Sequence, residues 1–457
     1  MTPWLPNLSA VLSYRKRERE EGSWPTRYTF QKKFMYTVEG EGAIIFGGMY
    51  ARVVKELKRL GVQYTVEDYR RALPEPLIDQ IQGPLREKQD LVLAAIASNH
   101  NGVINACTAF GKTYLICQLT RMYPKEKILI VSPRRAVISD IFQRVREVND
   151  GVVTMCDGSR TFREDSNVIV CTTGSLHKID KEWPTMVFFD ECHGAATDRI
   201  KELLIELDGP LMFGFSASPT GRGDGADLEV TGLFGEIICT ISYQEAQAAG
   251  SVAPIEVRMV QFQCDEIQAV ADTAKERRGY WRNKKRNKAV AKAALSFKDD
   301  EQVLILVKTA EHAMFLHKLL PDFAVVHAGI SFAKWESFVK LGLCTGEDYD
   351  TIAKVDTVDM KDKFKVGEVL KVIVTTTWKE GVDFPLLKGL VRADGMSGSI
   401  PAIQIGGRLS RGSEQKVLYD LTDEMGASYE RRSKDRVRNY KKSGWAVKPW
   451  IFPEDEK

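Results

Sequence analysis

The sequence predicts an α/β protein in which two successive lobes, each built on a parallel β-sheet, follow a small α+β region. Short apolar runs recur along the chain, and near-continuous runs of this kind are typical of strands buried on both faces of a parallel sheet. Amphipathic stretches of helical period separate the runs. This β-α repetition occurs twice, with a break around residues 241–262.

The apolar runs place the expected strands in order. The first set comprises GVINA (102–106), KILIVSP (127–133), NVIVCTT (167–173) and TMVFFDE (185–191). The second set comprises QVLILVK (302–308), FAVVHAG (323–329), LKVIVTTT (370–377) and KVLYDLT (416–422). Helices are expected between them, for example at AVISDIFQRVREVN (136–149) and AEHAMFLHKLL (310–320).

Three parts of the chain follow from this order. Residues 1–80 are expected to form an α+β accessory domain with DNA binding as a candidate role, because 27–40 has strand character and 49–61 has the period of a helix ended by Gly61. The first lobe is expected at 81–250, since a helix pattern ends at Gly250 and Pro254 opens an extended run. The second lobe is expected at 251–457, with an insertion near 335–359 where no strong period is present.

Composition narrows the class of protein. A chain of 457 residues with 44% apolar and 28% charged residues is too long for one core and suits a soluble globular protein. A net charge of +3 excludes a polybasic nucleic-acid coat but is compatible with a local basic groove. No apolar stretch approaches the roughly 18 residues of a membrane helix. Residues 1–20 lack the pattern of a signal peptide.

The cysteines and histidines show no metal-binding spacing. The eight cysteines are scattered without any C-x-x-C pair, and most are expected to be buried thiols in a reducing, cytoplasmic compartment. His312 and His317 are five residues apart, which places them off one helical face. We therefore expect them to be solvated helix residues.

The stretch ACTAFGKTY (106–114) resembles a phosphate-binding loop, whose pattern is Gly, four residues, then Gly-Lys-Ser/Thr. Gly111, Lys112 and Thr113 hold their positions, whereas Ala106 replaces the first glycine. Alanine costs little there if φ is negative. Lys112 would reach the β- and γ-phosphates and the Thr113 hydroxyl would ligate Mg²⁺. The alternative is a chance Gly-Lys-Thr at a helix start.

Two acids follow the apolar run TMVFF. Asp190 is suited to hold the metal and Glu191 to polarise the attacking water. Adjacent acids are also common at ordinary strand ends. Together with the loop they predict a nucleotide site, with both elements expected at the carboxyl ends of neighbouring strands.

The segment QIGGRLSR (404–411) carries Gln404, Arg408 and Arg411. The arginines are three residues apart and would share a helix face. A surface basic helix is the ordinary interpretation of such spacing. In a second lobe facing the first, however, an arginine can act as a finger that raises phosphoryl-transfer rates by ~10³–10⁵ and makes hydrolysis depend on closure of the lobes.

Taken together, these segments resemble the ordered motifs of the superfamily 2 helicases over residues 81–425. ACTAFGKT resembles motif I, VSPRR (131–135) motif Ia, CTTGS (171–175) motif Ib, DECH (190–193) motif II, FSASPTGR (215–222) motif III, TTTWKEGVDFP (375–385) motif V and QIGGRLSR motif VI. LREKQ (85–89) resembles the adenine-reading Q motif, with Lys88 in place of an aromatic residue. Phe110 stands where the family usually has a small residue, and Ser218 where it usually has Thr.

The resemblance implies two tandem RecA-like lobes that bind ATP and Mg²⁺. It implies ATP contacts at Gln89, Ala109, Gly111, Lys112, Thr113, Gly381 and Asp383, and metal ligation by Thr113 and Asp190. It implies catalytic roles for Asp190, Glu191, Gln404, Arg408 and Arg411. It implies that His193, Ser216 and Ser218 link the nucleotide state to the grip on nucleic acid.

Family geometry also implies a nucleic-acid strand that crosses both lobes. The contacts it implies are Pro133, Arg134, Thr173, Gly174 and Ser175 in the first lobe and Lys308, Thr309, Thr375 and Thr376 in the second. The run RRGYWRNKKRNK (277–288) fits either a phosphate-binding, base-stacking element or a helix packed on the lobe by its aromatic residues. For the basic tail at 428–450, a solvated surface helix is the favoured interpretation.

Within superfamily 2, DECH and residues 228–255 resemble the UvsW-like recombination and branch-migration helicases of phages, and the first 80 residues match their small leading domain. We therefore expect an ATP-dependent DNA helicase or translocase, moving 3′→5′ on single-stranded, forked or branched DNA in recombination, repair or replication. A monomer is expected, with an oligomer left open, in the host cytoplasm if the chain is phage-encoded. An RNA helicase and a non-unwinding ATP-gated clamp are the alternatives. A small-molecule P-loop kinase would leave Arg411 unexplained.

Overall fold

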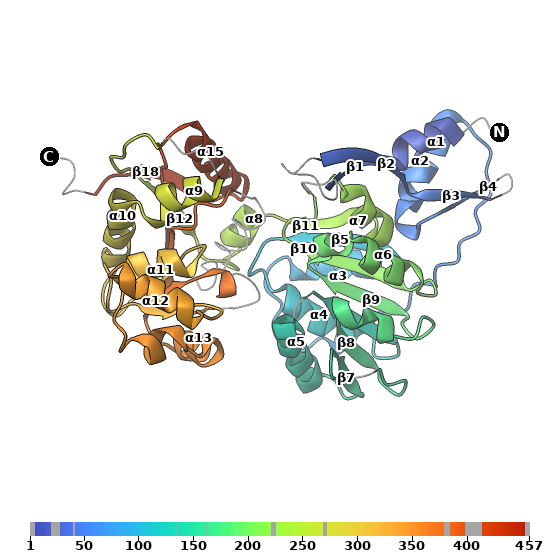
Figure 1. Ribbon diagram of the computed structural model, residues 1–457. Coiled ribbons are helices and arrows are strands. Elements are labelled where there is room, and N and C mark those ends of the chain that lie inside the picture. Colours follow the sequence, from blue (N-terminus) through green and yellow to red (C-terminus); the bar gives the residue numbers. More distant parts are fainter. Residues whose placement is uncertain are drawn as a thin grey trace. The chain divides into compact units, whose positions relative to one another are not determined.

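The computed structural model describes residues 5–19, 28–39, 42–133, 135–160, 162–220, 225–267, 272–378, 384–397 and 414–452. The chain divides into two compact units, Met1–Ile241 and Ser242–Lys457 (Figure 1). Each unit contains one seven-stranded parallel sheet covered by helices. The predicted α/β class with two tandem parallel-sheet lobes is therefore confirmed.

The N-terminal elements pack at one end of the first unit, where they are blue in Figure 1. They are α1 (Leu5–Val11), β1 (Ser13–Arg19), β2 (Tyr28–Phe34), β3 (Tyr36–Glu39), β4 (Gly42–Ile45) and α2 (Tyr50–Leu60), with β1–β2 and β3–β4 as antiparallel pairs. Helix α2 ends as its sequence predicts, because Gly61 adopts φ 65° and its N–H bonds the last carbonyls of the helix. Leu8, Leu12, Met35 and Met49 are among the residues of a small core here.

The sheet of the first unit has the strand order β11-β5-β10-β9-β6-β8-β7. Its strands are β5 (Asn101–Ala106), β6 (Ile128–Ser132), β7 (Val153–Cys156), β8 (Val168–Thr172), β9 (Met186–Asp190), β10 (Leu211–Ser216) and β11 (Ile237–Ile241). Its helices are α3 (Gln89–Ala97), α4 (Lys112–Met122), α5 (Arg135–Val148), α6 (Asp198–Ile205) and α7 (Asp227–Phe234). Strands β6 and β9 are buried at every position, as their near-continuous apolar sequences predict.

The sheet of the second unit has the order β14-β15-β13-β16-β17-β12-β18. Its strands are β12 (Ile255–Val260), β13 (Gln302–Leu306), β14 (Ala324–Val326), β15 (Lys371–Val374), β16 (Leu387–Arg392), β17 (Lys416–Leu421) and β18 (Ala446–Trp450). Its helices are α8 (Tyr243–Ala248), α9 (Asp272–Glu276), the π-helical turn η5 (Arg277–Trp281), α10 (Lys284–Leu295), α11 (Ala310–His317), α12 (Phe332–Lys340), the π-helical turn η6 (Tyr349–Ala353), α13 (Thr357–Val366) and α15 (Ala427–Lys442).

His312 and the cysteines differ from what the sequence predicts, which was a solvated histidine and mostly buried thiols. His312 is fully buried, not solvated, and its Nε2 lies 3.0 Å from Asn287 Oδ1. Burial, followed by the charge of Arg286, lowers the pKa of His312 well below its usual value. All eight cysteines carry free thiols, and Cys117, Cys156, Cys171 and Cys192 are the buried ones.

Candidate functional site

The phosphate-binding loop joins the end of β5 to the start of α4. Ala106 is the last residue of β5 and does not have a positive φ, so alanine meets no backbone cost where the usual pattern has glycine. Gly111 is different, because its φ is 101° and a Cβ there would lie 2.7 Å from Gln89 Nε2. The loop therefore keeps glycine at the position where its own backbone requires one.

Gln89 fastens this loop from the start of α3. Its side chain is fully buried, with Nε2 donating to the Phe110 carbonyl at 2.9 Å and Oε1 accepting from the Arg86 N–H at 2.9 Å. Arg86, which the sequence argument did not single out, also donates to the Ala109 carbonyl at 3.2 Å. Phe110 is fully buried, so its bulk contributes to the core while its carbonyl serves Gln89. The structure thus gives Gln89 a loop-positioning contact, and adenine reading stays a prediction.

Left-handed backbone is concentrated at this site. Among the described residues, the non-glycine positions with positive φ are Lys88, Ala109 and Glu191. Each such conformation costs on the order of 1–3 kcal/mol and persists only where the surroundings enforce it. Lys88 precedes Gln89, Ala109 lies in the loop, and Glu191 follows β9. Their clustering is a structural indication of function that the sequence pattern alone does not contain.

Asp190 ends β9 as a buried carboxyl. The Ser132 hydroxyl donates to its Oδ2 at 3.4 Å, a contact that the sequence argument missed although Ser132 lies in VSPRR. Burial, followed by the charge of Glu191, raises the pKa of Asp190 to about 7, and the Lys112 ammonium partly offsets this. A cation would therefore stabilise the charged carboxylate. Mg²⁺ takes one or two protein oxygens together with substrate phosphates and waters, so Asp190 and Thr113 fit it.

Lys112 stays close to the loop and to the acids. Its Nζ donates to the carbonyls of Ala106 at 3.2 Å and Cys107 at 3.4 Å. Its charge also acts on the pKa of Asp190 across the site. The structure thus brings the predicted phosphate-binding lysine and the predicted metal-binding carboxyl together.

The two motifs do not lie on neighbouring strands, and that prediction was wrong. Strand β10 lies between β5 and β9 and pairs with both. Because β10 ends at Ser216, the intervening strand brings Ser216 close to the acids. His193 Nδ1 lies 3.0 Å from Ser216 Oγ and 3.3 Å from Glu191 Oε2, and the Ser218 N–H donates to Ser216 Oγ at 3.0 Å. The three predicted coupling residues therefore form one connected set with Glu191.

The predicted nucleic-acid contacts of the first unit also share a sheet edge. Pro133 follows β6 and Thr173 follows β8, and these strands pair with Ser132 opposite Thr172. Pro133 and Gly174 are exposed and Thr173 is half-buried, whereas Ser175 is buried and its hydroxyl accepts from Thr172. The exposed positions are thus better placed for a strand than Ser175.

In the second unit, β13 and β15 pair directly, so the segments after them share an edge. Thr376 is exposed there, whereas Thr375 is buried and its Oγ1 lies 2.8 Å from Thr377 Oγ1. Thr309 caps α11 by accepting from the His312 N–H. Lys308 donates to both carboxylate oxygens of Glu276 at 2.7 Å.

The basic run 277–288 divides into buried and exposed residues. Tyr280 and Arg286 are buried, with Tyr280 edge-on to Tyr429 and the Arg286 guanidinium 4.7 Å from the Tyr280 ring centroid. Arg277 and Arg282 keep about half of their side chains exposed, at 51% and 40%. Packing by the aromatic residues therefore holds for part of the run.

The tail helix α15 is likewise not simply a surface helix. Tyr429, Ser433, Arg436 and Tyr440 on one of its faces are buried.

Several predicted site residues lie outside the described residues. They are Arg134, Gly381, Asp383, Gln404, Arg408 and Arg411, and their roles stay predictions.

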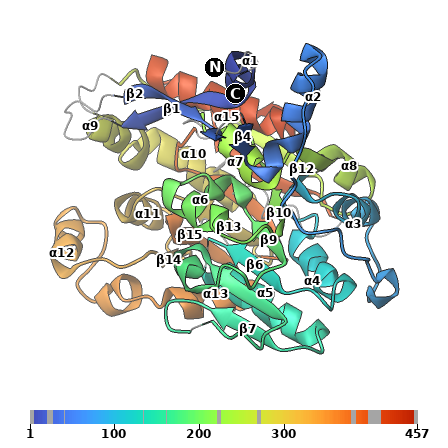
Figure 2. The ribbon, with the colours of Figure 1, turned by 90° about the vertical axis from the view of Figure 1, so that its right-hand side faces the viewer.

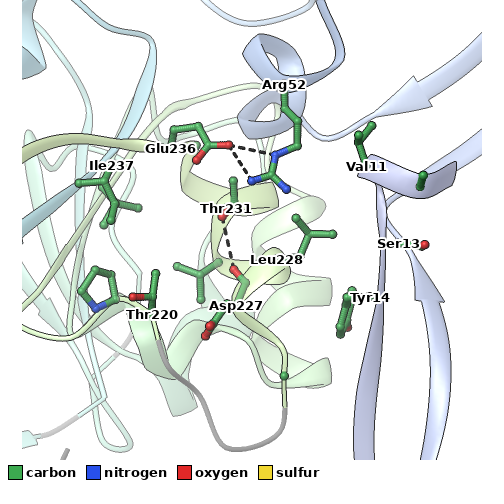
Figure 3. Close-up of a pocket in the computed structure, with 16 residues that line it drawn as sticks. Val11, Ser13, Tyr14, Arg52, Thr220, Asp227, Leu228, Thr231, Glu236 and Ile237 are labelled. Atoms are coloured by element: carbon green, nitrogen blue, oxygen red, sulfur yellow. Dashed lines mark hydrogen bonds and ion pairs between the residues drawn. The ribbon is translucent and has the colours of Figure 1, made fainter. Parts of the chain in front are cut away.

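A cavity of about 560 Å³ separates the N-terminal elements from the lobe that follows them (Figure 3). Ser13 and Tyr14 line one side, while Thr220 and residues of α7 line the other. Arg52 closes one end through its ion pair with Glu236 at 3.0 Å. The lining includes no residue of loop 106–113, so this cavity is distinct from the nucleotide site. It adjoins the segment that resembles motif III.

Comparisons with known proteins give two sequence matches, each over part of the chain. Residues 65–221 match the family "Type III restriction enzyme, res subunit". Over 71 residues the chain is 38% identical to "Putative helicase 22" of Sulfolobus islandicus filamentous virus (isolate Iceland/Hveragerdi), a match that covers 16% of this chain and 12% of that protein. Both matches cover less than half of this chain.

Two solved structures share the fold. The "fragment structure of a putative HsdR subunit of a type I restriction enzyme from Vibrio vulnificus YJ016" aligns with a TM-score of 0.59 at 14% identity, covering 98% of this chain and 93% of that one. Dbp5 of S. cerevisiae, bound to RNA and ADP BeF3, aligns with a TM-score of 0.52 at 14% identity, covering 81% of this chain and 90% of its own. At this identity the likeness concerns the fold alone. Within the described part of the chain, no helix is both long and apolar enough to span a membrane.

Proposed function

We propose that the chain is an ATP-dependent DNA helicase or translocase that moves 3′→5′ on single-stranded, forked or branched DNA. The observation that carries the proposal is the connected set in the first unit, which joins the phosphate-binding loop, the acid pair and Ser216 at the carboxyl edge of three strands. The predicted strand contacts after β6 and β8 lie at the same edge of the same sheet. Hydrolysis and grip are thus served by adjoining segments.

The residues divide the work as follows. The N–H groups of the loop and the Lys112 ammonium bind the triphosphate, because a loop at a helix N-terminus offers donors and positive charge to an anion. Thr113 and Asp190 hold Mg²⁺, which supplies charge neutralisation at the phosphates. Glu191 orients the attacking water. Arg408 and Arg411 act as arginine fingers on the phosphate that is transferred.

A change in the phosphate state reaches the strand through His193 and Ser216. Glu191, the residue proposed to orient the attacking water, is 3.3 Å from His193, whose ring contacts Ser216. The Ser218 N–H donates to the same hydroxyl, which links it to the segment that follows β10. We assign the use of forked and branched DNA to the resemblance of DECH and residues 228–255 to the UvsW-like group.

The test is the ATPase rate of the protein with single-stranded DNA, a forked duplex, a four-way junction and RNA. The proposal expects DNA to stimulate hydrolysis more than RNA, with the forked or four-way ligand giving the largest effect. Strand displacement on forks with one labelled arm then reports polarity. Greater stimulation by RNA would replace this function with that of an RNA helicase. Stimulation without displacement or movement would replace it with that of a clamp.

A further inference from the structure

Four cationic side chains of the second unit surround two carboxylates. Arg277 and Arg282 both bind Glu311, at 3.2 and 2.6 Å. Lys308 and Arg432 both bind Glu276, at 2.7 and 3.4 Å. The two groups of ion pairs are linked through the chain. Glu276 of one group is next to Arg277 of the other, and Lys308 and Glu311 both lie in the segment after β13. The six side chains therefore form one cluster, called here the arginine cluster, with a formal surplus of two positive charges.

The acidic side chains of the cluster are more buried than the basic ones. The carboxylate side chains are 9% exposed for Glu311 and 17% for Glu276, whereas the four cations range from 30% to 51%. The acids thus lie underneath and hold the cations in place. Arg277 uses one Nη and Arg282 its Nε toward Glu311, so each guanidinium has further N–H groups to offer a ligand.

The arginine cluster rests on rigid supports. The Trp281 carbonyl accepts from Asn287 of α10 at 2.9 Å, and Asn287 in turn is 3.0 Å from the buried His312 of α11. Beneath the turn η5, Tyr280 is buried and Arg286 binds Asp423 at 2.8 Å. Figures 1 and 2 show α9, α10 and α11 next to one another. A surface built on three packed helices can hold its cations in a fixed pattern.

The position of the cluster points to its ligand. Lys308 is the second residue after the end of β13, and the exposed Thr376 is the second residue after the end of the adjacent strand β15. The cluster therefore lies at the carboxyl edge of the sheet, among residues expected to bind nucleic acid. Exposed guanidinium groups with spare donors match the oxygens of phosphodiesters, which dominate sequence-independent binding.

We propose that Arg277, Arg282 and Arg432 form, with Lys308, a phosphate-binding surface for a nucleic-acid strand, pre-arranged by Glu276 and Glu311. The inference rests on the proposed function and deepens it, because it names contacts that the motif pattern does not contain. It also divides the basic run into a structural part, Tyr280 and Arg286, and a binding part, Arg277 and Arg282.

The experiment measures the affinity of a fluorescein-labelled oligo(dT) for the full chain against salt concentration. In the double variant Arg277→Gln/Arg282→Gln the slope of log K against log salt is expected to become shallower by about 1.4, since each phosphate contact on a single strand contributes roughly 0.7. The double variant removes both arginines that bind the buried Glu311 and could therefore fold poorly. A triple variant that adds Glu311→Gln removes the buried charge as well and keeps the proposal testable in that case. A thermal melt checks folding.

Two further variants separate binding from structure. Glu276→Gln removes the negative charge beneath Lys308 and Arg432, while its amide oxygen can still accept from these cations and hold them in place, so affinity at low salt is expected to rise. A merely structural role would not raise it. The matched control, Lys354→Gln/Lys363→Gln, removes two exposed cations that each pair with one acid, and it should keep the wild-type slope.

The outcomes distinguish this inference from the proposed function. If the folded triple variant keeps the wild-type slope, or if Glu276→Gln leaves the affinity at low salt unchanged, the arginine cluster is only structural and the inference is overturned. If the wild-type chain binds no oligonucleotide and its ATPase responds to none, the proposed function itself fails.

Discussion

His193 Nδ1 lies 3.0 Å from Ser216 Oγ, and this contact joins the acid-bearing segment after β9 to the end of β10. Ser216 is fully buried, and its hydroxyl also accepts from the Ser218 N–H at 3.0 Å. The same histidine is 3.3 Å from Glu191. Through His193, one hydroxyl thus connects the carboxylate that is predicted to orient water with the backbone leading away from the sheet.

Replacing Ser216 by Ala should uncouple hydrolysis from nucleic acid. The change leaves His193 and the Ser218 N–H without their shared partner, a loss of about 1–3 kcal/mol in a buried setting. A coupling loss of this size corresponds to roughly a 5- to 150-fold weaker stimulation of the ATPase by DNA. The measurement is the ratio of stimulated to unstimulated rates. Ser218→Ala is the control, because Ser218 contributes its backbone to the bond and should keep the ratio; equal losses in both variants would contradict the role of the hydroxyl.

Replacing Gly111 by Ala should weaken nucleotide binding. Position 111 has φ 101°, and the new Cβ would meet Gln89 Nε2 at 2.7 Å, which displaces the side chain that fastens the loop. A left-handed L-residue costs about 1–2 kcal/mol before that displacement is counted, so nucleotide affinity should fall about tenfold or more. Titration calorimetry with ATP measures it. Gly158→Ala has open space and ordinary φ and should bind as wild type does; matched affinities for the two variants would refute the loop geometry.

Sequence reasoning was strongest where local pattern decides the structure. The apolar runs predicted β5, β6, β8, β9, β13, β14, β15 and β17, because a strand buried on both faces leaves a local signature. Strand order leaves no such signature, and so β10 between β5 and β9 was missed. The prediction that His312 is solvated was wrong for a similar reason. Its burial depends on Asn287, 25 residues earlier in the chain, which no helical period reveals.

In the candidate site, too, residues with a local sequence signal were predicted and contacts between distant parts of the sequence were missed. Lys112, Asp190, Glu191 and His193 were predicted from motifs, since phosphate and metal chemistry limits which residues can serve. The contacts of Arg86 and Ser132 were missed because each supports a neighbour that lies far away in the sequence. Positive φ at Ala109 was likewise not predicted, as alanine gives no local signal for it.

Changing Glu191 to Gln should trap a nucleotide-bound state. The amide keeps the size of the side chain but cannot act as a base, so ATP should bind while its hydrolysis falls by about 10²–10⁴-fold. The protein should then remain on DNA in the presence of ATP. Single-turnover hydrolysis and filter binding measure the two effects. Lys112→Ala is the comparison, since it should abolish hydrolysis by weakening ATP binding. Wild-type turnover in the Glu191→Gln protein would remove Glu191 from the base role.

Arg408→Ala should bind ATP and fail to hydrolyse it, because the predicted finger acts on the transition state only. The rate loss should approach ~10³-fold or more, with the ATP dissociation constant changed little. Rapid-quench hydrolysis and equilibrium binding of ATP measure the two quantities separately. Arg438→Ala, an exposed arginine of α15, is the charge-matched control and should leave both unchanged. A large loss of ATP affinity in Arg408→Ala would instead assign this arginine to ground-state binding.

Arg436→Ala should destabilise the second unit in a pH-dependent way. Arg436 is fully buried and binds Asp420 and Asp423 at 2.8 Å each. Burial alone would raise the pKa of Asp420, but Arg436 and then Arg392 outweigh it and hold that pKa below its usual value. A depressed carboxyl pKa stabilises the fold above the unfolded-state value of about 3.9 and loses that effect as the pH falls through the folded value.

Removing one partner of a buried pair costs about 3–5 kcal/mol. The loss in free energy of unfolding of Arg436→Ala, measured by urea unfolding, should therefore be full at pH 7 and become smaller below about pH 4. Arg438→Ala on the same helix has a 77% exposed side chain and should unfold as wild type does; a deficit independent of pH would show that packing, not the ion pairs, is what Arg436 contributes.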